Sequence, residues 1–390
     1  MLSETGIPNL SNDDRVGGIW KAKNVYDMLV DGRNIWVGTY SGGVTMVSEP
    51  DVYEWIKHMP YNDQSVKGTH VYAMLEDRDG DIWYATNLGV SFYDVKKKKW
   101  THFLEEENSF LTLCEDSSGR IWTGGYSTGL YCVDKHRGVI KYIPSLQGGT
   151  QLECVYASAK DEDGDLWFGC LYSSLTRMSF VNGKEELTHY DIVQVKSIRV
   201  MDKERLFIAT SNGFYILNKR TGEKERYFAN PDNYGVKSNS FIYSSVSIGN
   251  EIWFGTDGGG LNCMNMATGT VINFSTYEGL PSNYIYGIIA DRQGFLWVST
   301  SKGLFCFDPA NKKFLYNIGN LPMKEFLFMS FTKLRDGRMA FGGTDGVLIF
   351  HPEDIKRAEL KPDLFFTDFR LFYKSIIPGC EPAILPKPVD

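Results

Sequence analysis

The sequence predicts an all-β fold, a β-propeller built from four-stranded antiparallel blades, and the prediction rests on one repeated motif. The motif is an aliphatic residue followed in most copies by Trp, with a small residue two positions after the Trp, as in Ile252-Trp253-Phe254-Gly255. Eight copies occur, and the Trp or its replacement stands at positions 36, 83, 122, 167, 207, 253, 297 and 340. A spacing of about 44 residues is typical of propeller blades.

The residues between two markers predict four short strands per repeat. In the second repeat, β-prone segments lie at residues 70–77, 82–86, 90–94 and 100–103, with turn-forming residues between them. No window shows a sustained apolar period of 3.6 residues, so we expect few helices. Repeat one is expected at residues 25–59, and the later repeats begin near His70, Phe110, Val155, Val195, Phe241, Ile285 and Phe326.

The marker residues have a structural interpretation. Blades pack face to face, so the Trp is expected to fill the space between two blades, and the small residue allows the backbones to approach. The small residues are Gly38, Ala85, Gly124, Gly169, Ala209, Gly255, Ser299 and Gly342. Among the seven Cys, Cys132, Cys263 and Cys306 share one strand position, which favours small buried hydrophobic residues. With no CxxC pair, neither a zinc ribbon nor a disulfide framework is predicted.

Ring closure requires a partner for the last repeat, because an unpaired strand edge is unfavourable. After Phe350 the chain leaves the repeat without a fourth strand of its own. The strand-like segment at residues 18–22, Gly-Ile-Trp-Lys-Ala, is our candidate for that strand. Deletion of residues 1–23 is then expected to lower the melting temperature sharply.

Composition and charge limit the classes of function. The chain has 390 residues, 43% of them hydrophobic, and a formal net charge of −7 without a basic stripe. We therefore expect no nucleic-acid partner. No apolar run reaches the roughly 18 residues of a membrane span, and no signal peptide is visible, so export would require a longer chain.

The pattern changes near the end of the chain. Residues 364–372 alternate like a strand, and Ser-Ile-Ile-Pro-Gly follows at 375–379. We predict a propeller over residues 1–355, then a linker and the first strands of a C-terminal immunoglobulin-like β-sandwich over residues 356–390.

The repeat resembles that of a known family. Residues 291–304, DRQGFLWVSTSKGL, are similar to the two-component regulator propeller repeat, and residues 350–371 resemble the passage from that propeller into a Tyr-rich sandwich. The resemblance implies the periplasmic sensor region of a membrane-anchored hybrid histidine kinase of the Bacteroides type. Such propellers usually have seven blades and occur in tandem, so either this ring has eight blades or repeat one belongs to a preceding propeller.

The resemblance also implies partners. They are an oligosaccharide derived from a complex polysaccharide, and the rest of the kinase chain, namely the sandwich, a membrane helix and the kinase; a homodimer is left open. Ligand binding would shift the propeller relative to the sandwich, and the kinase output would follow.

Residue patterns give little support to an enzyme. Most Asp residues lie in Asp-x-x-Gly turns, where turn formation explains them, and the acidic run at residues 161–165 lacks the full calcium-loop pattern. The six His show no metal-ligand spacing, and no Gly-x-Ser-x-Gly elbow occurs. We predict no catalytic residue, no metal and no cofactor.

A binding module is the preferred interpretation. The loops between strands two and three lie on the same face of a propeller as the loops between blades, and here these loops carry Tyr and polar residues. Aromatic rings with fixed polar groups suit a sugar. The candidate ligand-binding residues are Tyr40, Tyr61, His70, Asn87, Tyr126, Tyr172, Tyr234, Asp257, Tyr277 and Asn283. Because these loops contain few Arg or Lys, we expect a neutral or weakly charged oligosaccharide.

Two alternatives remain open. The propeller could be a protein-interaction scaffold, which predicts a broad exposed apolar patch. It could also be a propeller glycosidase or lyase, which predicts paired carboxylates.

Overall fold

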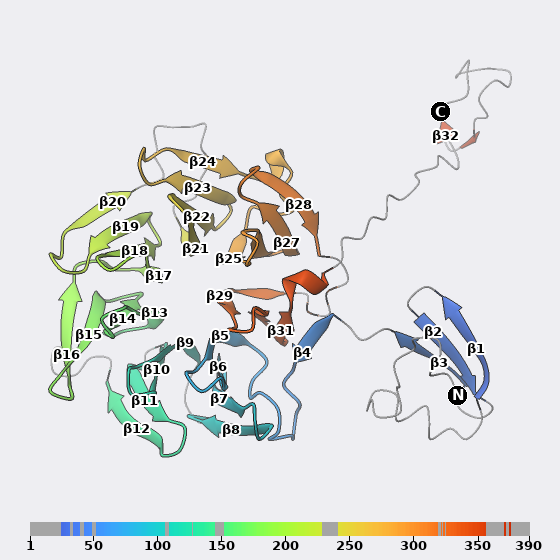
Figure 1. Ribbon diagram of the computed structural model, residues 1–390, viewed down its shortest axis with the longest axis horizontal. Helices are drawn as coiled ribbons and strands as arrows, with labels where there is room; N and C mark the ends of the chain where they lie inside the picture. Colours follow the sequence, from blue (N-terminus) through green and yellow to red (C-terminus); the bar gives the residue numbers. More distant parts are fainter. Residues whose placement is uncertain are drawn as a thin grey trace. The chain divides into compact units, whose positions relative to one another are not determined.

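Seven four-stranded antiparallel sheets form a ring, with the first strand of each sheet on the inside (Figure 1). The computed structural model describes residues 25–31, 34–39, 43–48, 52–105, 109–126, 128–144, 152–227, 241–318, 321, 323, 325–355, 370–371 and 374–375. The predicted all-β propeller is confirmed with seven blades, and the alternative of eight blades is wrong.

The blades follow one another along the chain. Blade 1 is β5 (Val71–Glu76), β6 (Ile82–Thr86), β7 (Gly89–Asp94) and β8 (Lys99–Phe103). Blade 2 is β9 (Phe110–Glu115), β10 (Ile121–Gly125), β11 (Leu130–Asp134) and β12 (Gly138–Ile143). Blade 3 is β13 (Val155–Lys160), β14 (Leu166–Cys170), β15 (Leu175–Val181) and β16 (Lys184–Tyr190). Blades 4 and 5 are β17 (Val195–Val200), β18 (Arg205–Thr210), β19 (Phe214–Asn218) and β20 (Lys224–Tyr227); β21 (Ile242–Ile248), β22 (Glu251–Thr256), β23 (Leu261–Asn265) and β24 (Val271–Phe274). Blade 6 is β25 (Ile285–Ala290), β26 (Leu296–Thr300), β27 (Gly303–Asp308) and β28 (Lys313–Asn317).

Blade 7 explains why eight repeats give seven blades. It contains β29 (Phe326–Lys333), β30 (Met339–Gly343) and β31 (Gly346–Phe350), and its outer strand is β4 (Tyr53–Ile56), which pairs antiparallel with β31. The other strands of repeat one, β1 (Val25–Asp31), β2 (Asn34–Thr39) and β3 (Gly43–Ser48), form a separate three-stranded sheet. Repeat one therefore contributes one strand to the ring.

The predicted closing strand was wrong. Residues 18–22 lie outside the described part of the chain, and the position beside β31 that we assigned to them is occupied by β4. The Trp55 indole donates to the Asp345 carbonyl at 2.9 Å, and Tyr53 packs edge-on against Phe350. Both segments read as short aromatic strands, and the sequence pattern had placed β4 inside repeat one.

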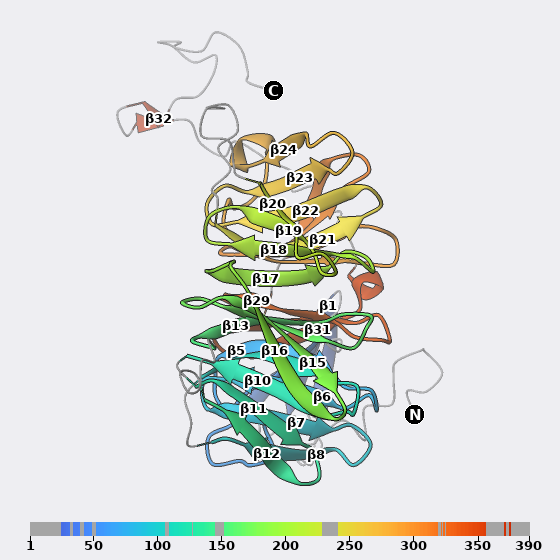
Figure 2. The same cartoon turned by 90° about the vertical axis from the view of Figure 1, so that its left-hand side faces the viewer.

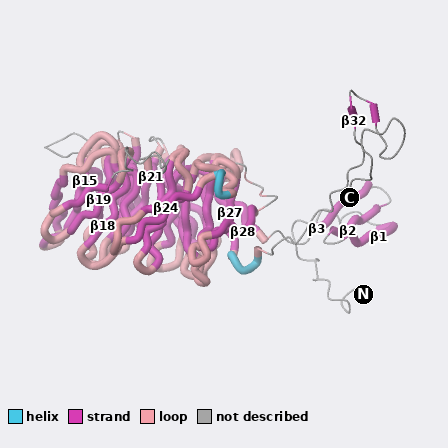
Figure 3. Tube along the Cα trace, turned by 90° about the horizontal axis from the view of Figure 1, so that it is seen from above, coloured by secondary structure: helices cyan, strands magenta, loops and turns pink. Residues whose placement is uncertain are grey.

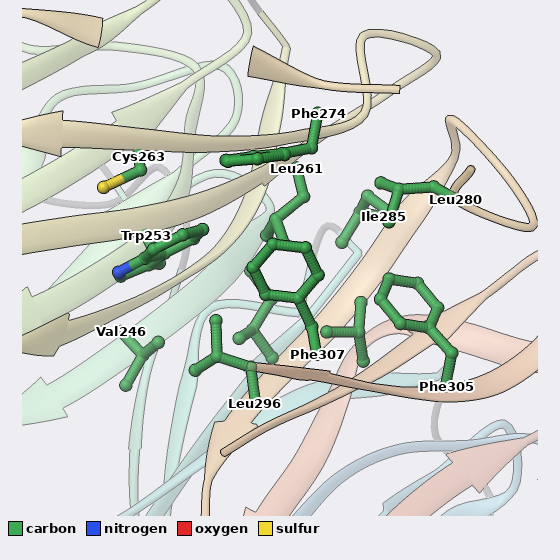
Figure 4. Packing of buried hydrophobic residues seen from close by; sticks show 12 residues of the cluster. Val246, Trp253, Leu261, Cys263, Phe274, Leu280, Ile285, Leu296, Phe305 and Phe307 are labelled. Carbon is green, nitrogen blue, oxygen red and sulfur yellow. The ribbon is translucent and has the colours of Figure 1, made fainter. Parts of the chain in front are cut away.

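Seven hydrophobic clusters, one at each seam between neighbouring blades, form the core. Figure 4 shows the cluster between blades 5 and 6, where the Trp253 ring stacks on Phe274 at 5.8 Å and also contacts Phe307. The marker residues Trp83, Trp122, Trp167, Trp253 and Trp297 are all fully buried. The three register-related cysteines are buried too, as expected.

The Asp-x-x-Gly turns hold the marker tryptophans. One oxygen of the turn Asp accepts backbone N–H groups of its own turn, and the other accepts the indole N–H six residues later at 2.9–3.1 Å. The pairs are Asp77 with Trp83, Asp116 with Trp122, Asp161 with Trp167, and Asp291 with Trp297. These carboxylates are therefore structural, because they form the turn and satisfy a buried donor.

An arginine after the turn Asp, or its equivalent, links neighbouring blades at these turns. Arg78 donates to the Asp116 carbonyl of blade 2, and Arg292 of blade 6 donates to the Asp336 carbonyl of blade 7. Arg335 of blade 7 donates to the Asp77 carbonyl of blade 1 at 2.5 Å. The seam that closes the ring thus uses the same contact as two internal seams.

The ring has two different faces, and loops gather at both of them (Figure 3). We call the face with the Asp-x-x-Gly turns the hairpin face. The opposite one, which carries the connections between blades and the turns between second and third strands, we call the loop face. Strands of successive blades are stacked side by side in the turned view of Figure 2. Each inner strand begins at the loop face, which fixes where its first residues lie.

Residues Lys356–Asp390 form a second compact unit, separate from Met1–Ile355. Its described residues are β32 (Arg370–Leu371) and β33 (Lys374–Ser375), which pair antiparallel. The predicted sandwich therefore stays a prediction. The described helices are the short 3-10 turns η2 (Thr276–Glu278) and η3 (Pro352–Asp354), and across the described ranges none could span a membrane.

Candidate ligand-binding site

A β-bulge recurs near the start of every inner strand. In blades 1 to 6 the pairing skips one residue, always the second of the inner strand, and in blade 7 the irregularity extends from Phe326 to Phe331. The skipped residues are Tyr72, Leu111, Tyr156, Lys196, Tyr243 and Tyr286. A bulge releases a residue from the ladder and redirects its side chain, so the ring presents one such side chain per blade near the loop face.

These side chains meet one another around the ring axis. Tyr243 of blade 5 stacks on Phe328 of blade 7, with ring centres 4.6 Å apart, and Tyr286 of blade 6 packs edge-on against Phe328 at 4.8 Å. Blade 6 lies between blades 5 and 7, so the contact between Tyr243 and Phe328 crosses the inside of the ring. Phe241 continues the cluster at 5.0 Å from Tyr243.

Tyrosines of blades 1 to 3 extend the cluster. Burial raises the pKa of the Tyr156 hydroxyl, and the neighbouring hydroxyls of Tyr126, Tyr243 and Tyr72 raise it further. Burial likewise raises the pKa of Tyr126, with Tyr72 and Tyr172 among its neighbours. We call the set Tyr72, Tyr126, Tyr156, Phe241, Tyr243, Tyr286 and Phe328 the aromatic collar. Lys196 of blade 4 contacts two of these rings and completes the collar, so that all seven blades contribute to it.

Lys196 is the basic residue of the collar. Its ammonium lies 4.2 Å from the centre of the Tyr156 ring and 4.8 Å from that of Phe241, and the residue is only 6% exposed. No carboxylate of the described residues forms an ion pair with it. Burial lowers the pKa of Lys196, and the nearby Cys154 thiol opposes this slightly.

The collar also contains a fixed acceptor. Asp257 accepts a hydrogen bond from the Tyr243 hydroxyl; burial first, and then this carboxylate, raise the pKa of Tyr243. The Asp257 backbone N–H donates to the Phe241 carbonyl at 3.0 Å, which ties the turn between β22 and β23 to the start of the inner strand. Rings, an ammonium and a carboxylate together can stack a ring-shaped ligand and hydrogen-bond to its substituents.

The structure brings some of the predicted site residues to the collar. Tyr126 belongs to it, the Tyr172 hydroxyl contributes to the raised pKa of Tyr126, and Asp257 bonds to Tyr243. The His70 ring lies 6.3 Å from that of Tyr72, and its backbone N–H donates to the Asn87 side chain at 3.1 Å. Asn87 thus positions His70.

Other predicted residues lie elsewhere on the loop face. Tyr61 is fully exposed in the connection between β4 and β5, and Tyr277 is 83% exposed on η2. The Asn283 side chain accepts from the Thr276 N–H at 2.7 Å and orders its own loop. Tyr40 and Tyr234 lie outside the described residues. Ligand binding by the ten residues stays a prediction.

Sequence reasoning missed most of the collar, because it looked for ligand-binding residues in the loops. A signal was present: an aliphatic residue, then Tyr, then a small residue opens four inner strands, as Val71-Tyr72-Ala73, Val155-Tyr156-Ala157, Ile242-Tyr243-Ser244 and Ile285-Tyr286-Gly287. Lys196 occupies the same position in Val195-Lys196-Ser197. The sequence analysis uses these residues only to mark where β-prone segments begin.

Two acidic turns of the hairpin face, those of Asp77 and Asp161, are neutralised by lysines. The Lys219 ammonium lies 3.1 Å from Asp161 and 2.8 Å from Asp163, inside the acidic run that faintly resembles a calcium loop. Lys135 bonds Asp77, Asp79 and Asp81 of the neighbouring blade in the same way. Within the described ranges, no group of three or more His, Cys, Asp or Glu could hold a metal ion.

Comparison with known proteins agrees with the repeat. Residues 65–88 and 279–302 match the model of the two component regulator propeller. Each match spans an inner strand, its hairpin turn and a marker strand, in blades 1 and 6. Two repeats of this β-propeller, in blades 1 and 6, therefore match the two component regulator propeller model.

Its relatives belong to signalling systems. The chain is 22% identical over 352 residues to histidine kinase P4 of Formosa agariphila, covering 82% of this chain and 25% of the kinase. It is 25% identical, with a TM-score of 0.72, to the extracellular domain of a protein assigned to the hybrid two component systems of B. thetaiotaomicron, covering 84% of this chain and 45% of that one. The chain thus spans a quarter of the kinase and less than half of the solved chain.

A more distant structure shares the fold alone. PorZ, a surface component of the type-IX secretion system of Porphyromonas gingivalis, is 15% identical with a TM-score of 0.58, covering 83% of this chain and 56% of that one. The two signalling relatives, and not PorZ, support a sensing role for this propeller.

Proposed function

We propose that this chain is the ligand-sensing propeller of a hybrid two-component system, that it lies in the periplasm as part of a membrane-anchored protein, and that its ligand is an oligosaccharide released from a polysaccharide. The single observation that carries the proposal is the aromatic collar, to which all seven blades contribute. A ligand held there contacts the inner strand of several blades at once, so binding is coupled to the geometry of the whole ring.

The chemistry of the collar favours a saccharide. Aromatic rings stack on the C–H face of a pyranose, while the Tyr hydroxyls and the Asp257 carboxylate hydrogen-bond to its hydroxyl groups. The carboxylates of the Asp-x-x-Gly turns are engaged with indole, backbone and lysine donors, which argues against a role for them as the paired acids of a glycosidase.

Signalling would require that the ligand distinguish two arrangements of the protein. A ligand shifts an equilibrium only by its difference in affinity for the two states. The kinase that reads the shift lies outside this chain.

The proposal is tested by calorimetry of the purified chain against a panel of plant, host and microbial oligosaccharides, with product analysis of the same mixtures. Micromolar binding without cleavage is expected. Tyr126→Ala and Tyr286→Ala should each weaken binding by about 10-fold or more, since each removes a stacking surface.

Tyr142→Ala is the matched control, because Tyr142 is 48% exposed on the outer strand β12 and packs on Tyr131 away from the inner strands. Its affinity should be unchanged. Cleavage products would show that the chain is an enzyme and contradict the sensor proposal. Absence of binding to every oligosaccharide of the panel would contradict saccharide binding by this propeller and favour an interaction scaffold.

A further inference from the structure

We propose that the collar recognises an acidic saccharide, and that Lys196 binds its anionic substituent, a carboxylate or a sulfate ester. This inference rests on the proposed function and narrows it, and it replaces the neutral or weakly charged ligand expected from the loops. It stands on the position of one ammonium within the collar.

Lys196 is buried without a counter-charge among the described residues. Lys196 is 6% exposed, and its ammonium lies over the rings of Tyr156 and Phe241, with no carboxylate of the described residues within ion-pair distance. Buried lysines are rare unless paired, and cation–π attraction offsets only part of the cost of removing an ammonium from water. In the propeller without ligand, the aromatic rings therefore stabilise the ammonium of Lys196 only in part, and the described residues supply no counter-charge.

A second lysine of the same ring shows how the fold treats a structural cation. Lys219 is 2% exposed, and its ammonium pairs with Asp161 and Asp163. Among the described residues, Lys219 has two carboxylate partners and Lys196 has none. A cation that binds a ligand must lack a carboxylate partner in the protein, because the ligand supplies the anion.

Lys196 also occupies the ligand-facing position that recurs from blade to blade. Lys196 is the bulged residue of β17, the position at which other blades place the collar residues Tyr72, Tyr156, Tyr243 and Tyr286. Gln194, two residues earlier, adopts a positive φ of 57°, a conformation that costs energy in a non-glycine residue. A strained turn and a bulge therefore place the ammonium among the rings that would stack on the sugar.

The one carboxylate identified in the collar does not neutralise it. Asp257 accepts from the Tyr243 hydroxyl, and no ion pair joins it to Lys196. The ammonium of Lys196 is therefore the group that we assign to the anionic substituent.

The test compares wild-type chain with Lys196→Met by calorimetry, using hexuronate oligomers, sulfated oligosaccharides without carboxylates, and neutral hexose oligomers of equal length. Lys196→Met should weaken the preferred acidic ligand by about 10- to 100-fold, as expected for a charged hydrogen bond. Binding of neutral oligomers should not change. The carboxylate and sulfate arms identify which anion is recognised.

Lys302→Met is the control, because Lys302 is exposed in the turn between β26 and β27 on the same face and tests general attraction. Lys196→Arg should retain most of the acidic preference. Melting temperature gives a readout that needs no ligand: Lys196→Met should melt higher than wild type, since it removes an uncompensated buried charge.

The outcomes separate the two proposals. Neutral oligomers that bind wild type and Lys196→Met equally well, without an acidic preference, would overturn this inference and leave saccharide sensing intact. A lower melting temperature of Lys196→Met would identify a structural lysine and overturn it as well. Absence of binding by every oligomer would overturn both.

Discussion

At the scale of single residues, the described part of the ring has two buried lysines, Lys196 and Lys219, and they differ in whether a carboxylate pairs with them. Lys219 of blade 4 is held by Asp161 and Asp163 of blade 3 and so joins two blades. Asp161 is fully buried and also accepts the Trp167 indole N–H. Removing the ammonium leaves a buried carboxylate without its counter-charge, which is more costly than never having built the pair.

Lys219→Met is therefore expected to lower the free energy of unfolding by about 3 kcal/mol. Urea denaturation followed by Trp fluorescence measures it. Arg220→Met is the matched control, since Arg220 is exposed and lies 3.8 Å from its nearest partner, Glu204. Equal stability of the two variants would contradict a structural role for the buried pair.

The same pair predicts a dependence on pH. The hydrogen bond from Lys219, and then its charge, lower the pKa of Asp163; burial opposes the rise in the pKa of Lys219, but the bonds to Asp163 and Asp161 outweigh it. A lowered Asp pKa gives stability that is present above the ordinary value of about 3.9 and lost as pH falls through the lowered value. A raised Lys pKa gives stability that persists up to about pH 10.4 and is lost above it.

The stability difference between wild type and Lys219→Met should thus stay constant between about pH 5 and 9 and narrow in more acidic solution. Denaturation curves at pH 3 and pH 7 provide the comparison. A difference that widens in acid would have the wrong sign for this ion pair.

At the scale of the element, the position two residues after the marker Trp sets how closely neighbouring blades approach. A Cβ on Gly169 would lie 2.4 Å from Val195 Cγ1 and 2.9 Å from Val195 Cβ, where Val195 opens the inner strand of the next blade. Gly255 stands in the same relation to Ile285. The close approach predicted from the repeated small residues is confirmed at these seams.

Gly169→Ala is expected to destabilise the ring by about 1–3 kcal/mol, because the rigid Val195 side chain and its strand must move. Ser299→Ala is its control, since Ser299 occupies the same position in blade 6 and already carries a Cβ. Thermal unfolding of both variants makes the comparison. A Gly169→Ala protein as stable as Ser299→Ala would mean that the seam is looser than the distances indicate.

Elements also differ in how readable they are from sequence. The second strand of each blade was predictable, because the marker Trp, the small residue and the turn Asp recur at fixed spacing. The collar was not, because it depends on a bulge, and a bulge changes the direction of one side chain without changing the pattern around it. The bulged residues also vary from Tyr to Leu111 and Lys196, so no single residue type marks the position.

At the scale of the whole molecule, the number of blades was the least predictable feature. Each repeat indicates a blade, but sequence spacing cannot show that β4 leaves β1–β3 and pairs with β31, about 290 residues away. Only the three-dimensional pairing decides which of two aromatic strands, at residues 18–22 or 53–56, meets Val347–Phe350.

Truncations test the closure. A chain that begins at residue 49 retains β4 and should melt, for its propeller, at the wild-type temperature; the deletion of residues 1–23 should do the same. A chain that begins at residue 58 lacks β4 and should melt markedly lower, because the edge of β31 and part of the last seam become exposed. Calorimetric scans of the three proteins decide the matter, and equal melting of all three would refute closure by β4.

The closing strand also has to wait for its partner during synthesis. Trp55 and the carbonyl that its indole meets in Asp345 are separated by 290 residues, which a ribosome adding about 5–20 residues per second needs roughly 15–60 s to translate. For that time β4 is an unpaired aromatic strand on a nascent chain, while blades 1 to 6 can already form behind it. Pairing of β4 with β31 is consequently the last step that becomes possible. Before it, the unpaired β4 can mispair with strands of other chains.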